Sequence, residues 1–289
     1  MSQATRGAFL VLAAGLVWSL AGVLVRAMEG AGSWQIVFYR SLWLAVTILA
    51  VLVWRHQGQT LAVIRRIGWA GWVGGASLGV GFCGYVFAMT HTTIANAQFL
   101  LAVSPFMVSL IAWAVIGERV AAVTWLAMIG ALLGVAVMVI DARGEGRMFG
   151  NAMALVAVAG FSVFTVTLRV GRLGDMTPSL GVAGLVAAGI GGVMIDDFAI
   201  SARDHALCMM LGSVQIGFGM LLFTLGSRLI PAGPLALLGL IEIVVGPLMV
   251  WLVFDEVPSS GTLVGGAIVI AAIVAQSAHG IRRGFAPAT

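Results

Sequence analysis

The sequence predicts an all-α integral membrane protein with ten transmembrane helices, arranged as two inverted five-helix repeats around a central cavity. Composition is the first indication: 61% of the residues are hydrophobic and 9% are charged, whereas about a quarter of the residues in a soluble domain are charged. The second is a series of ten uncharged runs, each near the roughly 20 residues that cross a bilayer as a helix. An internal repeat is the third.

The ten runs follow one another through short connections, which leave no room for a soluble domain between them. The first run follows Arg6, and its apolar stretch exceeds the roughly 7–15 residues of a signal-peptide core, so we expect a retained helix. The predicted helices lie near residues 7–26, 34–54, 68–89, 93–116, 120–140, 150–168, 177–195, 206–226, 232–254 and 259–281.

All fifteen basic residues are arginines, and their distribution predicts the orientation of the chain. With the N-terminus inside, ten of them fall in cytoplasmic segments and four outside, while Arg40 lies within a helix. The positive-inside rule therefore places both termini in the cytoplasm, in a bacterial-type inner membrane. The arginines are scattered and form no stripe, so the sequence pI near 10.0 does not indicate a nucleic-acid partner.

Two halves of the chain repeat each other, because residues 100–118 align with residues 238–256 at a constant offset of 138 without a gap. The matched pairs here and at slightly different offsets include Trp113 and Trp251, Glu118 and Glu256, Ser19 and Ser162, Gly81 and Gly217, and Phe82 and Phe218. Five is odd, so two five-span halves enter the membrane from opposite sides, which is the inverted repeat of many secondary transporters. We expect one repeat over residues 1–144 and the other over residues 145–289.

A proline in mid-helix followed by Gly-Glu at the helix end, as from Pro105 to Glu118, resembles the EamA family of the drug/metabolite transporter superfamily. In its second half that family commonly shows Glu-Pro in mid-helix and a terminal Glu, positions that Glu242 and Glu256 occupy. This sequence departs from the pattern, with Ile243 in place of the proline and Pro247 one turn later. The resemblance implies ten helices around a central cavity and small organic solutes, often exported amino acids or related metabolites.

Charged residues within the predicted spans are the strongest candidates for a functional site. Glu242 lies ten residues into its span and Arg40 about six residues from the outer end of the second. A charge in the bilayer core costs about 2.5–3.5 kcal/mol and usually faces a cavity or a partner. Glu242 either binds a cationic group of the substrate, carries a coupling proton, or is a structural acid packed against a neighbouring helix. For Arg40 the alternatives are a cavity position, a pair with Glu242, and snorkelling to the interface.

Neutral polar and aromatic residues in the spans complete the predicted substrate site, although aromatic residues in spans often serve packing alone. We expect Phe82 and Tyr85 to share one helix face, and Gln215 and Phe218 another, because residues three apart are neighbours on an α-helix. The predicted substrate-binding residues are Trp18, Arg40, Phe82, Tyr85, Asn96, Gln98, Phe99, Phe161, Gln215, Phe218 and Glu242.

Two glutamates at helix ends are candidates for gating, together with Glu242. Glu118 and Glu256 end their helices, where a carboxylate opposes the helix dipole, so we expect them to be paired or to act in a gate. In contrast, the glycines of small-xxx-small stripes, Gly71, Gly75 and Gly79, are expected to serve close helix packing.

The predicted function is that of a secondary transporter, an exporter by family resemblance, for a small organic metabolite such as an amino acid. An uptake carrier of the same fold shares every feature, and a channel is the third possibility. Intramembrane enzymes are disfavoured, because the four histidines lie at helix ends or in loops and no His-Glu-x-x-His spacing occurs. We expect no cofactor, no metal, and no partners beyond the substrate, lipid and coupling protons, in a monomer or homodimer.

Overall fold

The computed structural model describes residues 3–117, 122–141, 147–171, 176–227, 229 and 232–284, and within these ranges it contains helices and no strands. The helices up to residue 141 are α1 (Gln3–Arg26), α2 (Ser33–His56), α3 (Thr60–Arg65), α4 (Gly68–His91), α5 (Ile94–Leu101), α6 (Ser104–Ile116) and α7 (Ala122–Asp141). Those that follow are α8 (Arg147–Val170), α9 (Thr177–Met194), α10 (Ala202–Met209), the π-helix η1 (Met210–Phe218), α11 (Gly219–Ser227), α12 (Ala232–Phe254) and α13 (Ser260–Gly284).

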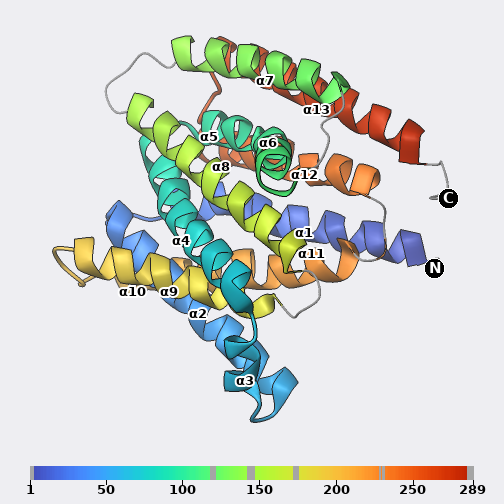
Figure 1. Cartoon of the computed structure of the whole chain (residues 1–289). Helices are drawn as coiled ribbons and strands as arrows, with labels where there is room; N and C mark the ends of the chain where they lie inside the picture. The colour runs from blue at the N-terminus through green and yellow to red at the C-terminus, as the bar shows by residue number, and fades with distance from the viewer. Residues whose placement is uncertain are drawn as a thin grey trace.

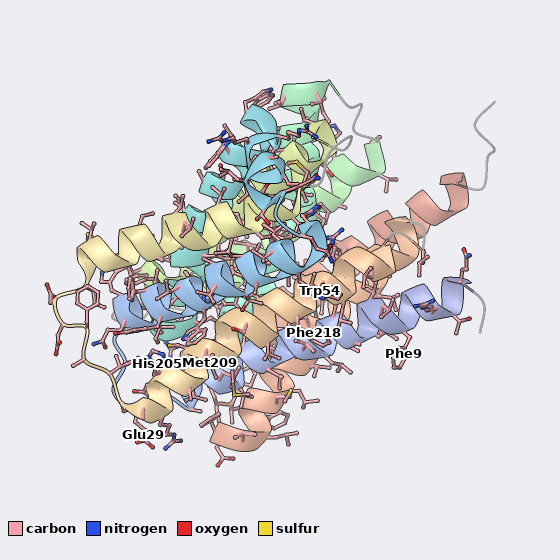
Figure 2. All side chains as sticks on the ribbon, turned by 90° about the horizontal axis from the view of Figure 1, so that it is seen from below. Phe9, Glu29, Trp54, His205, Met209 and Phe218 are labelled. Atoms are coloured by element: carbon pink, nitrogen blue, oxygen red, sulfur yellow. The ribbon has the colours of Figure 1, made fainter. Side chains whose placement is uncertain are left out.

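Seven described segments are long and apolar enough to cross a membrane, as an integral membrane protein requires. They are Thr5–Arg26, Ser33–His56, Gly68–His91, Ile94–Ile116, Arg147–Leu168, Thr177–Met194 and Ala202–Phe223. Three shorter apolar stretches, Trp125–Met138, Ile241–Phe254 and Ser260–Ala275, coincide with the other three predicted runs. Large apolar side chains such as Phe9 and Trp54 are exposed on the outside of the bundle (Figure 2), where hydrocarbon can contact them.

Two predicted spans are less regular than a single α-helix. The run near 93–116 is interrupted between α5 and α6, where Pro105 occupies the first turn of α6; proline is tolerated there because that turn needs no N–H donor. The run near 206–226 passes from α10 through η1 into α11. Such i→i+5 segments are rare and often lie at functional sites. The periodicity of the sequence predicts neither interruption.

Close helix packing depends on glycines, as the stripe on α4 predicts. A Cβ added to Gly75 would lie 2.7 Å from the Ser179 carbonyl oxygen on α9, and one on Gly79 would lie 2.8 Å from that of Ala183. On another face of α4, a Cβ on Gly84 would lie 2.6 Å from the carbonyl oxygen of Met153 on α8. Backbones this close leave no space for a side chain, so the packing role of the stripe is confirmed.

The helices pack in a recurring pattern of pairs (Figure 1). The packing of α4 along α8 resembles the packing of α11 along α1. Likewise, the packing of α5 and α6 on α8 resembles the packing of α12 on α1. Helices α2 and α9 form a further pair, and α7 and α13 pack together at one side of the bundle. Figure 1 also shows the start of α1 and the end of α13 at the same end of the molecule.

Candidate functional site

A cavity of about 220 Å³ lies between the helices of the two halves. The cavity is large enough for a small solute. The lining residues belong to α1, α2, α4, α5, α6, α8, η1, α11 and α12 and to the turn between α5 and α6: Trp18, Arg40, Leu78, Gly81, Phe82, Tyr85, Gln98, Leu101, Ala102, Ser104, Ala157, Phe161, Gln215, Ile216, Met220, Glu242 and Ile243.

Arg40 is the cation of this cavity. Its side chain is 1% exposed, and its guanidinium carbon lies 5.0 Å from the centroid of the Phe82 ring and 5.4 Å from that of Tyr85. Both distances are within the range of a cation–π interaction. The Arg40 side chain also donates from Nη2 to the Phe82 carbonyl oxygen at 3.3 Å, whereas its Nε has no partner. The snorkelling alternative is therefore wrong, because the charge is enclosed by helices.

Glu242 is the acid of the same cavity. It lies on α12 and lines the cavity together with Gln98 and Tyr85. Nε2 of Gln98 makes no hydrogen bond there. Within the described part of the chain, no ion pair joins Glu242 to Arg40. The cavity thus contains a basic and an acidic side chain that are not in direct contact.

Several neutral polar atoms in the cavity also have no hydrogen-bond partner. The hydroxyl of Tyr85, Nε2 of Gln98 and Oε1 of Gln215 are buried without a hydrogen-bond partner, and the other end of the Gln215 amide donates to the Trp18 carbonyl oxygen at 3.3 Å. Most buried polar atoms in proteins are hydrogen-bonded. A cluster of unsatisfied ones beside two charges is typical of a site that receives a polar molecule.

Eight of the predicted substrate-binding residues line the cavity, and three do not. Asn96 instead donates from Nδ2 to the Asn151 side chain on α8, and Phe99 packs against Gly266 on α13. Phe218 is 48% exposed on the outer face of the bundle (Figure 2). It does not share a face with the buried Gln215 because both lie in η1, whose wider turn points residues three apart in different directions.

Ser104 is a lining residue outside the predicted site, together with apolar residues such as Leu101 and Met220. The repeat contains the signal for Ser104, since it is the counterpart of Glu242 at the offset of 138. At an offset of 143 Trp18 is likewise the counterpart of Phe161, and both line the cavity. The apolar residues carry no such signal, because any span contains many of them.

An ion pair between Arg26 and Glu256 links several helices at one end of the bundle. Arg26 donates from Nε to the Glu256 carboxylate at 2.7 Å and from Nη2 to the Thr92 carbonyl oxygen at 2.9 Å. The second Glu256 oxygen accepts from the backbone N–H of Ile94 at 2.7 Å, at the start of α5, where a helix dipole favours an anion. Glu256 is therefore paired, and its part in a gate stays a prediction. Glu118 lies outside the described residues.

Comparison with known proteins adds a family and a fold. Residues 5–140 match the EamA-like transporter family. The chain is similar to the pseudopaline exporter CntI of Pseudomonas aeruginosa, with 29% identity over 94% of this chain and 95% of the relative, and to an uncharacterized transporter of Vibrio cholerae, with 22% identity over 98% and 96%. A solved crystal structure superposes with a TM-score of 0.67 at 17% identity, covering 96% of this chain and 98% of the other, a likeness of fold alone.

Proposed function

The chain belongs to the EamA family of drug/metabolite transporters, and we propose that it is a secondary carrier that exports a small organic metabolite by alternating access. The observation that carries this proposal is the cavity within the helix bundle that Arg40 and Glu242 both line without pairing. Charges buried in a membrane protein mark substrate or ion pathways. The relative named as an exporter supports the outward direction.

We further propose that the fold consists of ten spans in two inverted repeats. Helices α7, α12 and α13 contain 20, 23 and 25 residues, lengths that suffice to cross the bilayer. The recurring helix pairs support a pseudo-twofold relation between the halves. So do Ser19 and Ser162, matched residues whose hydroxyls both donate to the carbonyl oxygen four residues earlier.

In a carrier of this kind the two halves rock about the site, which opens to one side and then to the other. The cavity lining comes from helices of both halves, so relative motion of the halves would change access to Arg40 and Glu242. Helices α7, α9 and α13 contribute none of the described lining residues. We propose that they support the moving parts.

Cysteine labelling tests the proposed topology. The two native cysteines, Cys83 and Cys208, are buried, so an introduced thiol gives the main signal. We expect Gln57→Cys to react with a membrane-impermeant maleimide only from the cytoplasmic side and Ala199→Cys only from the outside, because the arginine distribution places them on opposite faces. Reaction of both from one side would refute the inverted ten-span arrangement.

Glu256 is proposed to hold the outer end closed, and its substitution tests this role. In Glu256→Gln the ion pair with Arg26 and the charge at the α5 terminus are lost, so the outward-open state is expected to become more populated. A cysteine at the cavity position Ser104 should then react faster with an impermeant reagent from outside than in the Ser104→Cys parent. An unchanged rate from that side would show that the pair does not control access.

A substrate screen tests the proposed activity itself. The purified protein is first screened by thermal shift against small metabolites, and stabilising compounds are followed by labelled transport in proteoliposomes with and without a proton gradient. A bound ligand raises the melting temperature by mass action. Protein-dependent transport of at least one stabilising compound is expected, and stabilisation without transport of any of them would refute a carrier function.

A further inference from the structure

Arg40 and Glu242 suggest the charge pattern of the substrate. We propose that the cavity binds a zwitterion whose carboxylate is held by Arg40 and whose cationic nitrogen is held by Glu242, an inference that rests on the proposed carrier function. One molecule that carries both charges neutralises both residues at once. It also explains why two opposite charges line one cavity without an ion pair between them in the described structure.

The donor side of the cavity is built around Arg40. Its guanidinium has five N–H donors and no acceptor, of which the described contacts use one, to the Phe82 carbonyl oxygen. The Tyr85 hydroxyl, which has no partner, adds a donor beside it. The rings of Phe82 and Tyr85 lie next to the guanidinium. Because the guanidinium is planar, its remaining N–H donors form a planar fork. Such a fork matches the two oxygens of a carboxylate.

The helix that carries Arg40 is held firmly in place. Gly212 of η1 lies so close to α2 that an added Cβ would collide with the Arg40 carbonyl oxygen and lie 2.9 Å from the Leu44 nitrogen. Three residues further on, Gln215 projects into the same cavity. The π-helical segment thus fixes the position of the backbone that carries Arg40 and also supplies the Gln215 amide of the cavity. A donor that is held in place before binding loses less conformational entropy when the ligand binds.

The acceptor side is built around Glu242. A carboxylate accepts hydrogen bonds and attracts a cation, and Oε1 of Gln215 is a further acceptor without a partner. Trp18 lines the cavity as well, and tryptophan is the best aromatic partner for a cation. A primary or secondary ammonium therefore meets an anion, an amide oxygen and an aromatic ring.

Ligands with one charge fit this arrangement less well. An inorganic anion or a simple carboxylate would neutralise Arg40 and leave Glu242 without a counter-charge, while a simple amine would do the reverse. In either case one charge stays uncompensated in a low-dielectric space, which is unfavourable. Leu78, Leu101 and Met220 supply apolar lining, which suits a zwitterion with a hydrophobic side chain in a volume of about 220 Å³.

Binding measurements on the purified full-length chain test this inference without transport. Leucine, methionine and phenylalanine serve as probes, each compared with its amide, which lacks the carboxylate, and its N-acetyl derivative, which lacks the ammonium. We expect at least one amino acid to bind with a millimolar or lower Kd, and both derivatives of it to bind at least about tenfold more weakly, as loss of one charged hydrogen bond implies. Absence of binding, or equal binding of a derivative, would overturn the assignment.

Two variants assign the poles individually. In Arg40→Gln the preference for the amino acid over its amide should fall to near one, while its preference over the N-acetyl derivative persists. In Glu242→Gln the opposite pattern is expected. Arg40→Lys, which keeps the charge, should retain part of the carboxylate preference and covers the case in which Arg40→Gln does not fold. Arg6→Gln, at the exposed start of α1, is the control and should keep both preferences.

A merely structural role gives a different result. If Arg40 and Glu242 only support the fold, each variant will weaken the binding of the amino acid and of its two derivatives by the same factor. The zwitterion assignment then fails. The inference also fails separately from the carrier function. Transport of a compound without one of the two charges, at the rate of the amino acid, would overturn the inference and support the carrier function. Charge-selective binding without any transport would support the inference and refute the carrier function.

Discussion

Glu242→Gln is expected to lower both substrate exchange and gradient-driven transport at least about tenfold, because the neutral amide removes the anion that holds the substrate cation. Hydrogen bonds to charged groups contribute about 1.5–3 kcal/mol, which corresponds to roughly 10–150-fold in affinity. The measurement is initial rates in proteoliposomes with and without a proton gradient. Asp196→Asn, which removes an exposed acid between α9 and α10, is the control and should transport at the rate of the unchanged protein.

The same experiment separates the two roles proposed for Glu242. Loss of gradient-driven transport with normal exchange would identify the residue as the carrier of a coupling proton and would contradict cation binding. Loss of both activities is the result that substrate binding predicts. Rates and pH dependence equal to those of the unchanged protein would exclude both roles and leave Glu242 as a structural acid on α12.

Gly84→Val is expected to have the largest effect on folding. The new Cβ would lie 2.6 Å from the Met153 carbonyl oxygen and 2.9 Å from the Ala157 nitrogen, both backbone atoms of α8. Backbone cannot yield as a flexible side chain does, so α4 and α8 must separate, and overpacking of this kind costs about 1–3 kcal/mol or more. We expect a lower melting temperature and little monodisperse protein on size-exclusion chromatography.

Gly189→Val is the matched control for this change. Gly189 lies within α9, and a Cβ there meets nothing within 4 Å, so the same side chain is added to a helix without a clash. Its melting temperature should stay within a few degrees of the unchanged protein. If Gly84→Val is equally stable, the close contact between α4 and α8 does not hold the bundle together.

The sequence identifies the seven described segments that can span a membrane and the two charged residues that line the cavity, because the physics behind both is strong. A long run of apolar residues is most stable in the hydrocarbon of a bilayer. A charged side chain within such a run costs too much free energy to face lipid. Arg40 and Glu242 are therefore identifiable from the order of residues along the chain. Their common cavity is not, since it depends on how α2, α4 and α12 pack around it.

The sequence predicts the uncharged part of the site less well. Phe218 is the counterpart of Phe82 in the repeat, yet the π-helical turn rotates it to the outer face. Asn96 has the polarity of a binding residue, but Asn151 on α8 occupies its amide. A local change of helix type and a partner from a distant helix are both invisible to spacing along one segment.

Counterflow in proteoliposomes tests the carrier function most directly. Vesicles loaded with an excess of unlabelled amino acid that binds the protein are diluted into a trace of the labelled compound. An alternating-access carrier returns labelled substrate inward as unlabelled substrate leaves, so we predict a transient accumulation of label above its equilibrium level. Label that only rises to equilibrium, at a rate independent of the internal amino acid, would indicate a channel and contradict alternating access around Arg40 and Glu242.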